Sequence, residues 1–235
     1  MRAILLAAGR GKRMRPLTDH TPKPLLPVYG KPLIVWHIEA LVRAGVRDIV
    51  VNTDWLEDQI VAALGDGGRW GASIRYSMEG RDCGGALETA GGIKKALALL
   101  VERAGDPFWV VSADIHAPGF DFGAPALRPF DPSDTWAHLW LVPNPPYHAR
   151  GDFGLDGNGY ALADGPGPDG RTWTYANLAL CRAALFDGVA AGSHAALGPL
   201  LFDAMRQRRI TAEVYDGAWD NIGTPAQWQS LQLPA

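Results

Sequence analysis

Cysteine and long apolar runs are both scarce in this chain of 235 residues. Its two cysteines, Cys83 and Cys181, show no metal-ligand spacing, so we expect two reduced thiols in a cytoplasmic protein. No run approaches the roughly 18 apolar residues of a membrane span. The first residues also lead straight into a strand pattern without an apolar leader segment. We therefore expect neither secretion nor a membrane partner.

Excess basic charge, histidine clusters and internal repeats are missing as well. The chain has 22 Lys and Arg against 25 Asp and Glu, and its net charge of −3 disfavours nucleic acid as a partner. The six histidines are scattered and form no H-E-x-x-H string. No hexapeptide repeat predicts a C-terminal β-helix, and the length and 47% hydrophobic content predict one domain over residues 1–235.

Acidic residues are nearly absent from the first 31 positions. This segment holds seven of the 22 basic residues and one of the 25 acidic ones, Asp19, so its net charge is +6 while the remainder carries −9. Within it, an apolar run leads into Gly9-Arg10-Gly11, where bare backbone N–H groups can face an anion. This composition predicts a binding site for a polyphosphate.

Two well-known glycine loops are excluded. No G-x-x-x-x-G-K-[ST] string of a P-loop occurs, and the dinucleotide fingerprint would need glycine where Met14 stands. Prolines instead punctuate residues 14–28, and each fixes φ and lacks an N–H group. We predict a stiff, extended loop there that mounts Arg13 and Lys23.

Strand and helix patterns alternate in the first half of the chain, as in a parallel sheet covered by helices on both faces. Gly45 is placed to end the first helix as a C′ glycine, and Thr89 to cap the third. The predicted strands are 3–7, 48–52, 74–77 and 108–112, and the predicted helices are 32–44, 56–64 and 89–100. The pattern predicts an α/β fold with a Rossmann-like, mostly parallel twisted sheet.

Glycine and proline become dense between residues 117 and 170, and the runs between them are short and β-rich. We predict a smaller, more antiparallel sheet region that forms the wall of a cleft, with strands near 136–142, 153–155 and 172–180. A helix at 198–207, a strand at 210–215 and a helix from residue 225 close the domain. Ligands of open parallel sheets bind beyond the carboxyl ends of the strands, so the Gly9–Gly11 turn and Asp114 should share one rim.

Several strings resemble those of the sugar-1-phosphate nucleotidyltransferases. The N-terminal strings are Leu6-Ala-Ala-Gly-x-Gly-x-Arg-Met, Thr21-Pro-Lys-Pro-Leu-Leu-Pro-Val and Gly30-Lys-Pro-Leu-Ile. Within that family, Leu87-Glu-Thr-Ala-Gly-Gly-Ile, Arg150-Gly-Asp-Phe and Trp219-Asp-Asn-Ile-Gly-Thr are most similar to the N-acetylmuramate α-1-phosphate uridylyltransferase branch. The resemblance runs from residue 1 to about 224 and is patchy from 114 to 180.

The resemblance implies a reaction in which a sugar-phosphate oxygen attacks the α-phosphorus of a nucleoside triphosphate and pyrophosphate leaves. It assigns Arg13 to the triphosphate and Lys23 to the sugar phosphate. It also implies a nucleotide-binding half, about 1–114, and a sugar-binding and closing half, about 115–235. The backbone around the glycine turn would contact base and phosphates, at Ala7, Ala8, Gly9 and Gly11.

Mg²⁺ is the cofactor that the resemblance implies. Asp114 matches the metal-binding aspartate of the family, although Ala113 stands where glycine is usual. Asn221 occupies the second metal position, where relatives most often have aspartate. An amide oxygen is a suitable ligand for Mg²⁺ but brings no negative charge.

Specificity is assigned by the same resemblance. Glu79, Glu88 and Thr89 would lie by the nucleobase. Asp152 and Asn177 would bind the sugar phosphate, with ordinary turn or strand roles as the alternative for those two. UTP and N-acetylmuramic acid α-1-phosphate are the expected substrates, in cell-wall recycling. Mannose-1-phosphate guanylyltransferase, glucose-1-phosphate thymidylyl- or uridylyltransferase, and a weakly catalytic nucleotide-sugar-binding paralogue stay open. So does a homodimer, because the sequence carries no mark of oligomeric state.

Overall fold

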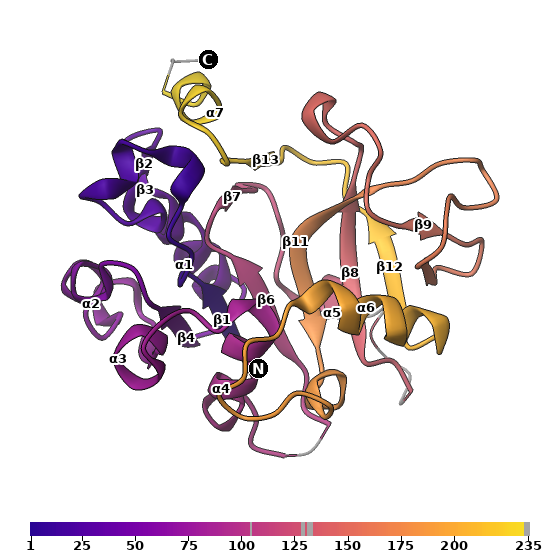
Figure 1. Cartoon of the computed structure of the whole chain (residues 1–235), viewed down its shortest axis with the longest axis horizontal. Coiled ribbons are helices and arrows are strands. Elements are labelled where there is room, and N and C mark those ends of the chain that lie inside the picture. The colour runs from indigo at the N-terminus through magenta and orange to yellow at the C-terminus, as the bar shows by residue number, and fades with distance from the viewer. Residues whose placement is uncertain (104, 128–129, 131–133, 233–235) are drawn as a thin grey trace.

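The computed structural model describes residues 1–103, 105–127, 130 and 134–232. Its centre is a seven-stranded mixed sheet in the order β12-β8-β11-β6-β1-β4-β5, with helices packed against it (Figure 1). The strands of this sheet are β1 (Arg2–Leu6), β4 (Asp48–Thr53), β5 (Ser73–Met78), β6 (Phe108–Ser112), β8 (Ala137–Val142), β11 (Thr174–Cys181) and β12 (Ile210–Val214). This confirms the predicted α/β fold.

Seven helices and three small strand pairs complete the described chain. The helices are α1 (Leu33–Arg43), α2 (Glu57–Leu64), α3 (Glu79–Cys83), α4 (Glu88–Leu100), α5 (Ala124–Leu127), α6 (Leu197–Arg206) and α7 (Pro225–Ser230). The pairs are β2 (Pro27–Val28) with β3 (Lys31–Pro32), β7 (Ile115–His116) with β13 (Asp220–Asn221), and β9 (Gly154–Leu155) with β10 (Ala161–Leu162). Helix α7 lies beside the β2–β3 hairpin (Figure 1), and Trp228 Nε1 donates to the Pro27 carbonyl at 2.7 Å. None of the described helices combines the length and the apolar character needed to cross a membrane.

The parallel strands are apolar on both sides because helices cover both faces of the sheet. In β1, Leu5 belongs to one core cluster together with Ile38 of α1, while Ile4 belongs to the other together with Ile93 of α4. All four side chains are fully buried. The unbroken apolar runs that identified these strands in the sequence therefore reflect burial on two faces.

The end of α1 agrees with the sequence. Gly45 has φ +85°, its N–H donates to Val42 O at 2.9 Å, and Val46 N–H donates to Leu41 O at the same distance. These two bonds are the Schellman arrangement, which needs a left-handed residue at the glycine position. The chain is thereby turned directly into β4.

The β-rich region differs from the prediction in one respect. Its strands are antiparallel as expected, since β11 pairs antiparallel with both β6 and β8. However, β8 and β11 extend the first sheet rather than forming a separate one, and only β9, at the predicted strand 153–155, pairs apart from it with β10. Strand β6 would otherwise be an open edge with unpaired backbone groups, and pairing Cys181 with Phe108 covers that edge.

Two local predictions were wrong. Residues 14–28 are extended only in part, at β2: the chain before it folds into 3₁₀ turns at Lys12–Met14, Leu17–Asp19 and Lys23–Leu25, because the φ that proline imposes suits this helix as well. Thr89 is not the cap of α4, which begins at Glu88. The carbonyl of Ala195 instead accepts from the N–H groups of Ala90 and Gly91, at 2.9 and 3.1 Å, so no side-chain cap is needed.

Candidate active site

Two adjoining cavities open where the parallel strands end. Leu6, the last residue of β1, pairs with Asn52 of β4 on one side and Ser112 of β6 on the other, so three strands deliver the chain to one rim. The smaller cavity has a volume of about 370 Å³ and the larger about 600 Å³. They share five lining residues, Leu6, Arg13, Glu88, Thr89 and Ser112. A ligand could therefore extend from one cavity into the other.

The glycine turn forms one wall of the smaller cavity. Gly11 has φ +64°, and a Cβ there would lie 3.0 Å from Thr18 Cγ2, so both its backbone and its surroundings favour glycine. Thr18 Oγ1 donates to the Gly11 carbonyl at 2.9 Å and holds the turn from behind. A Cβ at Gly9 would meet nothing within 4 Å, so the backbone there is open to a ligand. All eight residues predicted to bind nucleotide line this cavity: Ala7, Ala8, Gly9, Gly11, Arg13, Glu79, Glu88 and Thr89.

Lys23 and Asp114, which are far apart in the sequence, form an ion pair in the same cavity. Lys23 Nζ lies 2.7 Å from Asp114 Oδ2, and the two side chains are 9% and 37% exposed. Lys23 is held in a 3₁₀ turn, and Asp114 follows β6. Asp114 and the Gly9–Gly11 turn line the same cavity, so the prediction that they share one rim is confirmed. Each of the two charges neutralises the other.

The short β7–β13 ladder brings the backbone beside Asn221 to Asp114, while Asn221 itself lines the larger cavity. Asn221 pairs with Ile115, and the N–H of the next residue, Ile222, donates to the Asp114 carbonyl at 3.0 Å. The side-chain oxygen of Asn221 is buried and has no hydrogen-bond partner. A buried oxygen without a donor suits a cation, and carboxylate and amide oxygens are ligands that Mg²⁺ accepts. Asp114 and Asn221 thus fit a magnesium site, while no group of three or more His, Cys, Asp or Glu in the described ranges forms another.

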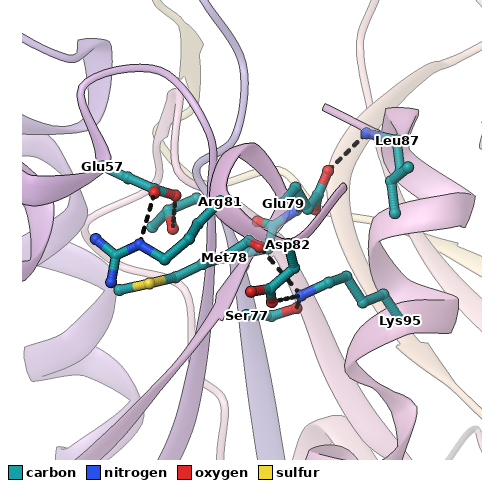
Figure 2. Close-up of polar contacts among 10 residues, drawn as sticks. Glu57, Ser77, Met78, Glu79, Arg81, Asp82, Leu87 and Lys95 are labelled. Atoms are coloured by element: carbon teal, nitrogen blue, oxygen red, sulfur yellow. Dashed lines mark hydrogen bonds and ion pairs between the residues drawn. The ribbon is translucent and has the colours of Figure 1, made fainter. Parts of the chain in front are cut away.

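Glu79 is placed in the wall of the smaller cavity with its carboxylate already bonded. The residue is fully buried, and its two oxygens accept from Asn52 Nδ2 and from Leu87 N–H, both at 2.7 Å. Burial raises the pKa of the Glu79 carboxyl, and these two bonds oppose the rise. Figure 2 shows the carboxylate directed at the Leu87 N–H from α3. The sequence identified Glu79 but not Asn52, although a polar residue at the end of a parallel strand was the available signal.

The wall between the cavities is formed by the first residues of α4. Glu88 has φ +60°, a left-handed value that is uncommon outside glycine, and its side chain is exposed. Thr89 follows on the same helix. Two of the three predicted base-side residues, Glu88 and Thr89, thus border both cavities, while Glu79 borders only the smaller one.

The larger cavity contains two of the three predicted sugar-phosphate residues, Asp152 and Asn177, whereas the third, Lys23, lines the smaller cavity. Asp152 Oδ2 accepts from Tyr175 N–H at 2.8 Å, and its Oδ1 lies 2.9 Å from His148 Nε2. Asn177 sits where the register between β11 and β8 shifts, and has φ +59°. Such a bulge redirects a side chain out of the regular alternation of a strand.

Several residues of the larger cavity were not found from the sequence. Its polar members include His148 and Tyr147, and its apolar members include Leu197, Phe202 and Trp219. Trp219 is fixed by its indole N–H, which donates to the Ala176 carbonyl at 2.9 Å. The sequence predicts only that Phe202 lies on a helix. Local sequence does not indicate which face of that helix lines a cavity.

The comparisons with known proteins agree with this geometry. Residues 2–131 match the family model described as nucleotidyl transferase. The chain is 46% identical over 236 residues to N-acetylmuramate alpha-1-phosphate uridylyltransferase of Neisseria meningitidis, covering 100% of this chain and 98% of that protein. It is 32% identical to the protein of the same name in Caulobacter vibrioides, with coverage of 95% and 92%. In fold, it is similar to a structure assigned as a glucose-1-phosphate thymidylyltransferase from Bacillus anthracis, with a TM-score of 0.80, 21% identity and coverage of 98% and 94%.

Proposed function

The chain belongs to the nucleotidyl transferase family and is a sugar-1-phosphate nucleotidyltransferase, and from this premise we propose that it joins UTP to N-acetylmuramic acid α-1-phosphate. The products are UDP-N-acetylmuramic acid and pyrophosphate, a reaction of cell-wall recycling. The observation that carries the proposal is the pair of cavities that meet at Arg13, with Lys23 and Asp114 beside them.

The smaller cavity is the site for the nucleotide in this proposal. Backbone N–H groups around Gly9 and Gly11 face the phosphates, and Arg13 adds a guanidinium where the two cavities meet. Preorganised donors of this kind stabilise charge as it develops, without reorganisation at the moment of reaction. The larger cavity then receives the sugar, and Lys23 of the smaller cavity binds the phosphate of that substrate.

Lys23 changes partner when phosphate arrives. Its ammonium is bonded to Asp114 at 2.7 Å, and an entering phosphate group offers a stronger, multiply charged acceptor. Transfer of Lys23 to the phosphate releases the Asp114 carboxylate. Mg²⁺, when held by Asp114 and the amide oxygen of Asn221, supplies positive charge that the transferred phosphates require.

The chemical step needs positioning more than covalent help. A phosphate oxygen of the sugar phosphate forms a bond to the α-phosphorus of UTP, and the bond from that phosphorus to the pyrophosphate oxygen breaks. The bonding electrons leave with pyrophosphate. Arg13 and Lys23 neutralise the charges on the two substrates, so that their phosphates can approach.

The choice of uridine and of muramate is supported by the two relatives at 46% and 32% identity, each named for that reaction. The size of the larger cavity, about 600 Å³, also leaves room for a sugar with substituents. His148 and Arg13 are the basic residues among its lining. Because Arg13 serves the phosphates, His148 is the suitable partner for the carboxylate that distinguishes muramic acid from other N-acetylated hexosamines.

Pyrophosphate release from a panel of substrates tests the proposal. UTP, dTTP, GTP and CTP are each combined with the α-1-phosphates of N-acetylmuramic acid, N-acetylglucosamine, glucose and mannose. We expect the highest kcat/KM for UTP with the muramic acid phosphate. Lys23→Met should abolish release, whereas Lys31→Met, in the same basic segment but outside both cavities, should retain it. Preference for another pair would replace the substrate assignment, and tight nucleotide binding without release from any pair would favour a paralogue without transferase activity.

A further inference from the structure

Two buried polar side chains connect opposite walls of the smaller cavity. Asn52 Oδ1 accepts from the N–H of Ala7 at 2.8 Å, and Asn52 Nδ2 donates to Glu79 Oε1 at 2.7 Å. Glu79 Oε2 accepts from the N–H of Leu87 at 2.7 Å. The chain of bonds therefore runs from the residue that begins the glycine loop to the residue before Glu88.

Neither side chain of this link is free to move. Asn52 is 3% exposed and Glu79 is 0% exposed. Helix α4 packs against them at Gly92, where a Cβ would clash with Glu79 Oε1 and lie 2.9 Å from Asn52 Nδ2. Both oxygens of Glu79, and the amide oxygen and amide nitrogen of Asn52, are hydrogen-bonded within this link. A buried polar network is rigid when its groups are satisfied in this way.

Helix α3, which carries Glu79, is itself held from outside (Figure 2). Lys95 of α4 donates to the Met78 carbonyl at 3.2 Å and to Asp82 Oδ2 at 2.6 Å. On the opposite side, Arg81 lies 3.6 Å from Glu57 of α2. Helix α3 is thus held between α2 and α4, and these contacts fix the position of the Glu79 carboxylate.

We propose that Asn52 and Glu79 are positioning residues that set the separation between the glycine loop and residues 87–89, and thereby the fit of the nucleotide. This inference rests on the proposed function for its kinetic consequences. Ala7 leads into the loop that faces the phosphates, and Leu87 leads into Glu88 and Thr89 at the wall between the cavities. Glu79 acts through these backbone groups, with both oxygens engaged in protein bonds.

The pattern of donors and acceptors makes the inference testable. The carboxylate of Glu79 faces two donors, so Glu79→Gln turns an NH₂ group toward one of them. Asn52→Asp places two carboxylates face to face. The double variant restores complementarity: Asp at 52 accepts from the Ala7 N–H and from the new amide at 79, whose oxygen accepts from the Leu87 N–H. Size and net charge match the wild type.

The experiment compares wild type, both single variants and the double variant. The readouts are UTP affinity by calorimetry, KM for nucleotide and for sugar phosphate, and the unfolding midpoint. We expect each single variant to weaken UTP binding and raise the nucleotide KM about tenfold, the effect of one unsatisfied buried donor or repelled pair. The KM for sugar phosphate should change less, and the double variant should return within about threefold of wild type. Glu102→Gln serves as the matched control, because Glu102 is exposed and pairs with Arg2, at the end of β1 away from the cavities.

Three results would overturn the inference. They are unchanged UTP affinity in both single variants, no recovery in the double variant, and a loss in Glu79→Gln that depends on which nucleobase is used, which would mean direct contact with the base. If a single variant fails to fold, the double variant alone decides, since its UTP affinity must match wild type. If the wild type binds UTP but transfers nothing, the proposed function fails, while the affinity comparison still judges the link.

Discussion

The ion pair between Lys23 and Asp114 predicts unequal costs for removing its two members. Asp114→Ala leaves the ammonium of Lys23 unpaired in a site where its side chain is 9% exposed, whereas Lys23→Met leaves a carboxylate that is 37% exposed. Removing one member of a fully buried pair costs about 3–5 kcal/mol, and exposed pairs contribute about 0–1 kcal/mol. Because Lys23 borders the cavity, we expect Asp114→Ala to lower the free energy of unfolding by about 2 kcal/mol, and Lys23→Met by less than about 1 kcal/mol.

Urea unfolding without nucleotide or Mg²⁺ measures these costs, with the double variant completing the cycle. Since Lys23→Met removes the unpaired ammonium, the double variant should be more stable than Asp114→Ala alone. The two single variants should differ in stability but not in activity. Both should lose at least about 100-fold in kcat, the cost of removing one charge-stabilising group. Equal unfolding costs for the single variants, or costs that simply add in the double variant, would refute the reasoning.

Two further predictions concern acid stability and the metal. Burial lowers the pKa of His37 and of His138 from 6.5 to about 4. Between pH 6.5 and 4, these histidines are therefore protonated in the unfolded chain but mostly neutral in the folded chain. The unfolding free energy should therefore fall between pH 6.5 and 4, by about 2 kcal/mol per histidine at pH 5. In His37→Gln, the unfolding free energy measured by urea titration should fall less steeply with decreasing pH. For the metal, Asn221→Ala should raise the Mg²⁺ concentration for half-maximal turnover, and Asn221→Asp should lower it, since only the latter adds negative charge. An unchanged Mg²⁺ titration in both variants would exclude Asn221 as a ligand.

The parts of the fold that could be predicted were those that depend on residues close together in the sequence. Strands buried on two faces appear as unbroken apolar runs, so residues 108–112 were recognised without knowledge of their neighbours. Gly45 likewise marks a helix end by its own backbone freedom. The glycine loop and its surrounding cations combine both kinds of signal, which is why the smaller cavity was anticipated most fully.

What could not be predicted depends on partners distant in the sequence. The sequence of residues 172–180 does not indicate that they will pair with β6. This pairing joins the β-rich region to the parallel strands in one sheet, where the sequence had predicted two. Thr89 is a good capping residue, but the carbonyl of Ala195 took that role from more than a hundred positions away. Glu79 was recognised by resemblance, and only its contacts with Asn52 and Leu87 indicate that its carboxylate supports the cavity wall.

A crystal structure with the product UDP-N-acetylmuramic acid and Mg²⁺ tests the central claim most directly. The account predicts uridine in the smaller cavity against the glycine loop, the sugar in the larger cavity near Asp152 and Asn177, and the pyrophosphate linkage between them beside Arg13. Lys23 should have left Asp114 for a phosphate oxygen. A product bound in the reverse orientation, or with its phosphates away from Arg13 and Lys23, would contradict the account.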